Sequence, residues 1–166
     1  MADKWRDQIT KNAVELFSHA PDPLENTFDY PEDPGLFGPS SVTWLVMSDV
    51  ASFIGGIRAL IVQAAHPEVA AGVSDHSRYE QDPLGRLSRT ASYVTATAYG
   101  SMTEVNKAIK SVRSAHRPVS GVSHRGKEYS ANKSDLAAWV HNALIDSFLT
   151  AYRIYGSRAM TQEEAD

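Results

Sequence analysis

The sequence contains no cysteine, which excludes disulfide bonds, thiolate metal sites and cysteine nucleophiles together. Motifs of three other catalytic classes are missing as well. No glutamate precedes a histidine by three residues, as di-iron bundles require, and there is no His-Glu-x-x-His zinc motif. A Gly-x-Ser-x-Gly nucleophile elbow is also absent. The sequence therefore argues against the common serine hydrolases, zinc hydrolases and di-iron carboxylate bundles.

Long apolar runs are missing too. The most apolar stretch, Val42 to Ala65, is interrupted by Asp49 and Arg58, which an isolated transmembrane helix would not readily carry. The first seven residues include charged side chains and do not contain the apolar core of a signal peptide. We expect a cytoplasmic protein with no integral membrane segment, and the sequence leaves peripheral membrane contact open.

An excess of basic charge is absent, because the net charge is −4 and the isoelectric point is about 5.8. This balance argues against a general nucleic-acid binder. Alternation typical of β-strands is also scarce, with one weak hint between Val119 and Tyr129. The length of 166 residues and the hydrophobic fraction of 42% are ordinary for one soluble domain. We predict an all-α fold: a single globular domain, residues 1–166, of six or seven helices.

Prolines are few outside one segment. Residues 19–39 hold five of the eight prolines, so this segment cannot form a regular helix. It is longer than an ordinary connection between two elements. Two interpretations remain, a surface loop or a lid over a binding site, and both predict little regular structure in the proline-rich loop at residues 21–39.

Apolar residues at helical spacing predict the helices. Several predicted helices begin next to residues that commonly cap helix N-termini, including Asp49 and Asp82. Gly55 and Gly56 lie inside one predicted helix, where each costs about 1 kcal/mol relative to alanine. Something should therefore approach the backbone there, either another helix or a flat cofactor. The predicted helices cover residues 3–18, a short segment around 44–47, residues 50–65, a segment from 67, a segment from 83, residues 103–116 and a segment from about 134.

Several polar residues fall on these helices at positions that require a partner or a function. Arg86 and Thr90 lie on one polar stripe of the same helix. His116 follows Val112 by one helical turn, so we expect it to face an apolar interior. His141 lies beside the apolar face of the last long helix.

Each of these residues also has a structural interpretation. A lone histidine on an apolar helix face is more often a hydrogen-bonded core residue than a ligand. Arg86 could pair with Asp82 or Asp146, because a buried arginine needs a carboxylate, carbonyls or a ligand. Thr90 could donate to a carbonyl of its own helix. Arg58, one turn after the glycine pair, could pair with a carboxylate of the protein or with an acidic group of a cofactor.

The order and spacing of several motifs carry a family resemblance. From about Gly38 to Gly156, the chain resembles the rubber oxygenase (latex clearing protein) and mycophenolic-acid-type oxygenase family. The most specific part is Arg86 to Thr90 followed by His116. The motifs that carry the resemblance are Arg58-Ala-Leu, Ala65-His66-Pro67, Arg86-Leu-Ser-Arg89-Thr90, His116 to Gly121, and Trp139-Val-His141.

The resemblance implies a globin-like helical fold that binds haem b and uses O2 to attack a small hydrophobic substrate. It implies that His116 is the axial iron ligand, and that Arg86 and Thr90 lie near the haem. One histidine is enough to hold a haem, so the absence of di-iron and zinc motifs does not exclude haem binding. Relatives continue beyond the last residue of this chain, so we expect the C-terminus to be incomplete relative to the family.

The predicted function is therefore that of a haem-dependent oxygenase, an oxidoreductase. Arg86, with Thr90 or Arg89, would stabilise negative charge that develops on oxygen. His141 is the second candidate for the axial ligand, and Arg58 could bind a haem propionate. The alternative is a non-catalytic helical module that binds haem or a lipid-like ligand. Leu87, Val94, Ile109, Leu144 and Phe148 would line the apolar pocket.

Overall fold

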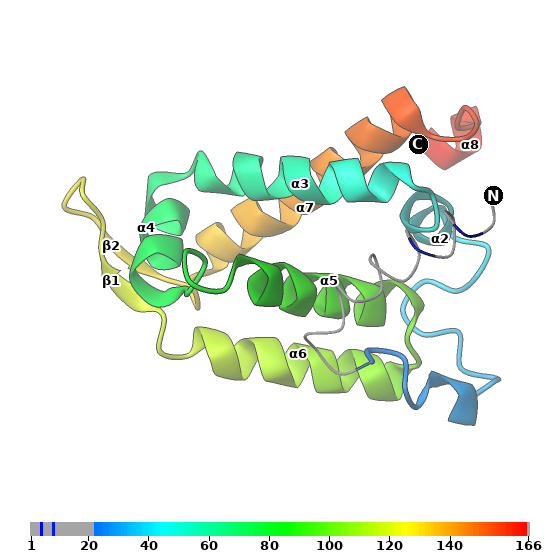
Figure 1. The fold of residues 1–166 in the computed structure, drawn as a ribbon, viewed down its shortest axis with the longest axis horizontal. Helices are drawn as coiled ribbons and strands as arrows, with labels where there is room; N and C mark the ends of the chain where they lie inside the picture. Colours follow the sequence, from blue (N-terminus) through cyan, green and yellow to red (C-terminus); the bar gives the residue numbers. More distant parts are fainter. Residues whose placement is uncertain (1–3, 5–7, 9–21, 166) are drawn as a thin grey trace. The chain divides into compact units, whose positions relative to one another are not determined.

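The computed structural model describes Lys4, Gln8 and residues 22–165, and most of its regular structure is helical (Figure 1). The described residues contain seven α-helices, one 3-10 helix and one two-stranded hairpin, which confirms the predicted all-α class. The predicted helix at residues 3–18 lies outside the described residues, apart from Lys4 and Gln8. The elements are η1 Thr27–Asp29, α2 Val42–Met47, α3 Ala51–Ala64, α4 Pro67–His76, α5 Pro83–Tyr99, α6 Met102–His116, β1 Ser120–Val122, β2 Glu128–Ser130, α7 Ser134–Tyr155 and α8 Gln162–Ala165.

The chain divides into two compact units. The first comprises the described residues up to Leu36 together with Ser77–Val112, so it contains η1, α5 and most of α6. The second comprises Phe37–His76 and the residues from Arg113, and it contains the remaining elements. The backbone passes between the units before α2, after α4 and within the last part of α6.

In the first unit, the proline-rich segment is tied to the start of α6. Within its described residues only η1 is helical, so the predicted lack of regular structure is confirmed there. The buried carboxylate of Glu104 accepts hydrogen bonds from the backbone N–H and the side-chain amide of Asn26. Asp33 accepts the backbone N–H of Met102 at 2.7 Å. These bonds satisfy an N–H group at the N-terminus of α6 and fix the segment within this unit.

The start of α5 follows the predicted cap. The Asp82 side chain accepts the backbone N–H of Gly85 at 2.9 Å. Pro83 occupies the first turn, where its missing N–H has no intrahelical partner to lose. This start sets the register of α5, which places Arg86 and Thr90 one helical turn apart.

The second unit is built on the contact between α3 and α7 (Figure 1). The helices approach closely at Gly55, where an added Cβ would lie 2.7 Å from Cδ1 and 3.0 Å from Cα of Phe148. At Gly56 the nearest atom to an added Cβ is 4.0 Å away. The expected close approach is therefore confirmed for Gly55, where it is a neighbouring helix, and it does not extend to Gly56.

The two sides of α3 differ sharply in burial. Small residues, Ala51, Gly55 and Ala59, form its buried face. The opposite face exposes large apolar side chains, with Val50 and Ile61 at 76% and 69% exposure. Even so, none of the helices in the described chain combines the length and the apolar character needed to cross a membrane.

The weak β pattern corresponds to the antiparallel hairpin β1–β2, in which Gly121 pairs with Tyr129. The Tyr129 hydroxyl donates to the carboxylate of Asp75 on α4. Burial, together with this bond to a carboxylate, raises the pKa of Tyr129 to about 12. An added Cβ at Gly121 would lie 2.6 Å from the Tyr129 hydroxyl oxygen. The glycine and the tyrosine together hold the hairpin against α4.

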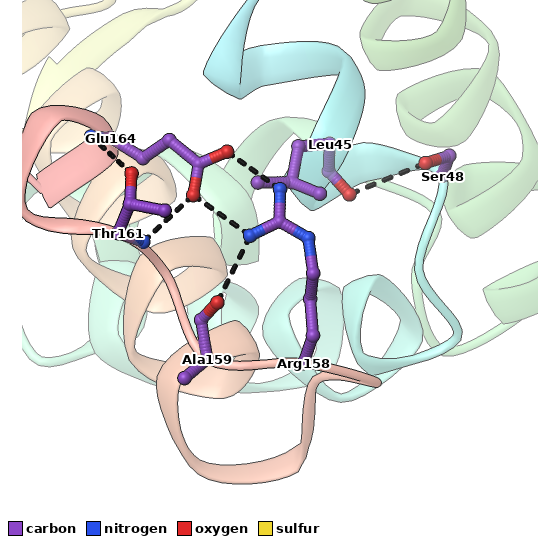
Figure 2. A network of polar contacts seen from close by, with 6 residues as sticks. All are labelled: Leu45, Ser48, Arg158, Ala159, Thr161 and Glu164. Carbon is purple, nitrogen blue, oxygen red and sulfur yellow. Dashed lines mark hydrogen bonds and ion pairs between the residues drawn. The ribbon is translucent and has the colours of Figure 1, made fainter.

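The end of the chain is held by an ion pair, which Figure 2 shows. The guanidinium of Arg158 donates to both carboxylate oxygens of Glu164, at 2.9 and 2.6 Å. The backbone N–H of Thr161 donates to the same carboxylate at 2.8 Å. The hydrogen bonds from Arg158 and from the Thr161 backbone lower the pKa of Glu164 to about 2. This network links α8 to the turn that follows α7.

Candidate functional site

Arg86 and Thr90 are both half-buried on α5. The Thr90 hydroxyl donates to the backbone carbonyl of Arg86 at 3.1 Å, as its structural interpretation predicted. Its hydrogen is therefore used within the helix, while its oxygen can still accept a hydrogen bond. Thr90 can bind a donor group of a ligand without giving up this contact.

The Arg86 guanidinium makes no hydrogen bond or ion pair with a residue that the structure describes. Asp82, the predicted carboxylate partner in the same unit, pairs with Arg89 instead. Burial lowers the pKa of Arg86; nearby Tyr79 opposes this effect and the positive charge of Arg89 adds to it. A partly desolvated guanidinium without a neighbouring anion fits an acidic or oxygen-rich ligand.

Arg89 is more exposed and lies at the start of the same helix. Its guanidinium is 3.3 Å from the Asp82 carboxylate, which also caps α5. An exposed pair of this kind contributes little to stability. Arg89 would have to leave Asp82 before it could bind a ligand with the same nitrogen.

His116 is the last residue of α6, and the prediction that it faces an enclosed apolar interior is wrong. Val105 near the start of α6 is fully buried, whereas Ala115 and His116 are exposed. Helical spacing sets the direction of a side chain, but tertiary packing decides whether that direction is covered. Partial desolvation still lowers the pKa of His116. Its imidazole is therefore neutral at pH 7, the form that binds iron.

The two remaining predicted residues lie on α7 and α3. His141 is exposed on α7. Nη1 of Arg58 lies 2.6 Å from the Asp146 carboxylate and 2.8 Å from the Ser147 hydroxyl. Arg58 therefore has the protein carboxylate that its structural interpretation predicted. A role for Arg58 in binding a cofactor stays a prediction.

The predicted site residues are divided between the two units. Arg86, Arg89 and Thr90 belong to the first unit, within five residues of one helix. His116, His141 and Arg58 belong to the second, on three different helices. The prediction that both sets form one site stays a prediction.

The structure also reveals a polar pair that sequence reasoning missed. Glu68, in the first turn of α4, is only 7% exposed, and its carboxylate lies 3.3 Å from Nδ1 of His66. The apolar residues Val69, Ala70 and Val73 of the same helix are only half-buried. The motif Ala65-His66-Pro67 drew attention to the histidine, but acidic residues are common in first turns, so nothing marked this glutamate as buried.

The side chains that could bind a metal ion or a haem limit which cofactor the chain could hold. Within the described residues, no group of three or more histidine, aspartate and glutamate side chains could hold a bare metal ion. A haem needs only one protein ligand and cationic partners for its acidic groups. His116 is a neutral histidine, and Arg86 is a guanidinium with no ion pair in the described part of the chain. Both are of these kinds, so the side-chain chemistry fits a haem.

Comparison with known protein families gives a match over residues 44–166. The match begins within α2, continues to the end of the chain, and includes all six predicted site residues. The matching description is "ER-bound oxygenase mpaB/B'/Rubber oxygenase, catalytic domain". Comparisons with curated proteins and with solved structures gave no significant match. Because the family match covers well over half of its length, the chain belongs to the family of mpaB/B' and rubber oxygenase catalytic domains.

Proposed function

We propose that this chain is a haem b-dependent oxygenase that uses O2 to attack a small hydrophobic substrate. The family supports the reaction class, since the matched region is an oxygenase catalytic domain. The observation that carries the haem assignment is Arg86, a partly desolvated guanidinium with no anion beside it among the described residues. A bound haem would supply the oxygen chemistry and two propionates that need cationic partners.

His116 is the residue proposed to hold the haem iron. Its lowered pKa keeps a ring nitrogen lone pair available at pH 7. Its position at the end of α6 leaves the ring exposed, so a flat group could approach it without displacing a packed core. His141 is the second candidate, because it is also an exposed histidine on a helix of the matched region.

Arg86 is proposed to stabilise negative charge, either on a propionate or on the reacting oxygen. Among the described residues, no carboxylate uses its five N–H donors, so no ion pair with them must break before a ligand binds. Thr90 would act as an acceptor, because its own hydrogen is bound to the Arg86 carbonyl. Arg89 would serve as a further donor only after leaving Asp82.

The hydrophobic substrate is proposed to contact half-buried apolar side chains of the first unit, Leu87, Val94 and Ile109. Leu144 and Phe148 belong to the second unit, and their predicted part in the lining stays a prediction. Phe148 is less available than its sequence position suggested, because it packs against Gly55.

The alternative is a non-catalytic module that binds haem or a lipid-like ligand. The exposed apolar face of α3 favours this alternative, with Val50, Ile57 and Ile61 each at least 60% exposed. Large exposed apolar patches commonly mark surfaces that bind apolar partners. The two candidates differ in whether O2 is consumed.

The deciding experiment is expression with haem supply, followed by absorption spectroscopy and oxygen-uptake measurements. We expect a Soret band with about one haem per chain, and oxygen consumption with at least one member of a panel of small hydrophobic substrates. A folded, haem-loaded chain that consumes no oxygen would favour the non-catalytic module. A chain that is helical by circular dichroism and binds no haem would contradict both haem proposals.

A further inference from the structure

Exposed apolar side chains form a stripe along α3, on the side of the helix that faces away from α7. Figure 1 shows α7 packed along α3, and the contact between them is made where Gly55 meets Phe148. The stripe lies on the opposite side, and each of its residues is exposed. Its members, which we term the α3 stripe, are Val50, Ile54, Ile57, Ile61 and Ala64.

The α3 stripe has the spacing of a coiled-coil seam. Its successive members are four, three, four and three residues apart. This alternation keeps the side chains on one line, where each can fit between the side chains of a facing helix. Branched isoleucine and valine side chains, which occupy four of the five positions, are common in such seams. A narrow stripe of this kind therefore indicates one helix as its partner.

The composition of α3 favours a second copy of the chain over a lipid surface. From Val50 to Ala65, Arg58 is the only charged residue, and its guanidinium is held by Asp146 of α7. A two-fold axis places a surface against the same surface of the other copy, so charged residues in the stripe would face like charges. Helices that lie on a membrane surface usually carry several lysines and arginines beside the apolar face. The α3 stripe has the uncharged character that the first arrangement requires.

The apolar area exposed on α3 is sufficient for a weak dimer. The exposed fractions are 76% at Val50, 69% at Ile61, 60% at Ile57, 59% at neighbouring Phe53 and 45% at Ile54. At roughly 200 Å² for each fully exposed large side chain, these five residues leave about 600 Å² open. Two copies would then bury about 1,200 Å², the lower end of the range for stable interfaces. We expect a dissociation constant in the micromolar range.

We propose that the chain forms a two-fold dimer in which the α3 stripe packs against the α3 stripe of a second copy. The dimer uses none of the residues assigned to haem, oxygen or substrate, so it does not rest on the proposed oxygenase function. It would cover the apolar face that favours the non-catalytic module. That face would then no longer be open to a lipid-like ligand.

Size-exclusion chromatography with light scattering tests the proposal on the full chain. The concentration is varied from about 1 to 200 µM, which brackets the expected dissociation constant. We expect the mass to rise from the chain mass of 18.2 kDa toward twice that value. Measurement in the absence of added haem keeps the result separate from the oxygenase proposal.

Two matched lysine variants locate the interface. Ile57→Lys places a charge at the middle of the α3 stripe, opposite its own copy, and should raise the dissociation constant at least about tenfold. Val122→Lys changes a residue of the hairpin with nearly the same exposure, 61% against 60%, and should dimerise like the wild type. Both side chains are exposed, so both variants should remain helical by circular dichroism.

A cross-linking measurement gives a second, independent result. The chain contains no cysteine, so a single introduced cysteine reports only on its own position. Ile57→Cys should form a covalent dimer under mild oxidation, because the middle of the stripe lies next to the middle of the other stripe. Val122→Cys should remain a monomer on the same non-reducing gel.

Four outcomes would overturn the proposal. The first is a mass of one chain throughout the concentration range, and the second is an assembly of three or more chains. The third is equal dimerisation of Ile57→Lys and Val122→Lys, which would place the interface elsewhere. The fourth is a monomer that binds phosphatidylcholine vesicles and loses this binding in Ile57→Lys, which would assign the α3 stripe to a lipid surface.

Discussion

Arg58 on α3 and Arg86 on α5 are both half-buried arginines on helices, yet their surroundings differ. Arg58 donates to Asp146 and Ser147 of α7. Arg86 has no such partner among the described residues and is partly desolvated. A half-buried arginine on a helix is therefore not itself a sign of a ligand site. What separates the two is whether a neighbouring helix supplies the anion.

The largest expected effect comes from replacing Arg86 with methionine. Arg86→Met should lower the oxygen-consumption rate of the haem-loaded protein about 100-fold, the usual cost of losing one charge-stabilising donor. Its melting temperature should stay close to the wild-type value, because Arg86 has no ion pair with a described residue that could be lost. Oxygen uptake and thermal unfolding measure the two effects. A strong loss of stability with full activity would show that Arg86 is structural.

The contact that brings the partners of Arg58 into reach can be broken at Gly55. Gly55→Ala places a Cβ 2.7 Å from Phe148, and such overpacking should destabilise the protein by about 2 kcal/mol. Gly56→Ala meets nothing closer than 4.0 Å and should stabilise it by up to about 1 kcal/mol. Urea unfolding of both variants measures the difference. Equal effects of the two changes would contradict the close approach at Gly55.

Arg58→Met should affect stability and leave the chemistry intact. It removes hydrogen bonds to a partly exposed carboxylate and a buried hydroxyl, so we expect a loss of about 1 kcal/mol. Haem binding should be retained if Arg58 serves the α3–α7 contact alone. Haem content and urea unfolding report the two properties. A variant that is as stable as the wild type but loses haem would restore Arg58 to the cofactor pocket.

The smallest expected effect concerns a third arginine, Arg158, which holds the carboxylate of Glu164 (Figure 2). The pKa of Glu164 falls to about 2 in the folded chain, below the ordinary value near 4.3 for glutamate. The pair therefore contributes its full stabilisation above the ordinary pKa and loses it as the pH falls toward 2. The amide NMR signal of Thr161, which donates to Glu164, should shift over this range. The same shift in Arg158→Gln would show that the arginine is not the cause.

Local structure was largely predictable from sequence, because its causes are local. Asp82 and Pro83 marked the start of α5, and the glycine pair marked a close approach that occurs at Gly55. The start of α5 depends on neighbours within one turn. The close approach at Gly55 is made by Phe148 of α7, which the glycine pair alone could not identify.

The site was less predictable, because burial and partners depend on residues far apart in the chain. His116 had the spacing of an inward residue but is exposed. Glu68 had the composition of an ordinary first turn but is buried against Ser123 of the hairpin. Arg58 could be assigned to Asp146 only once α3 and α7 were seen to pack together. The sequence pattern identified the residue types of the site but not their surroundings.

The most direct test of the central claim is haem titration of His116→Ala beside His124→Ala. His124 is also exposed, and it does not lie in a helix, which makes it a matched control. We expect His116→Ala to lose the Soret band of the stoichiometric complex, and His124→Ala to retain it, with both variants helical by circular dichroism. A folded His116→Ala chain with the wild-type Soret spectrum would contradict the assignment and make His141 the first candidate for the axial ligand.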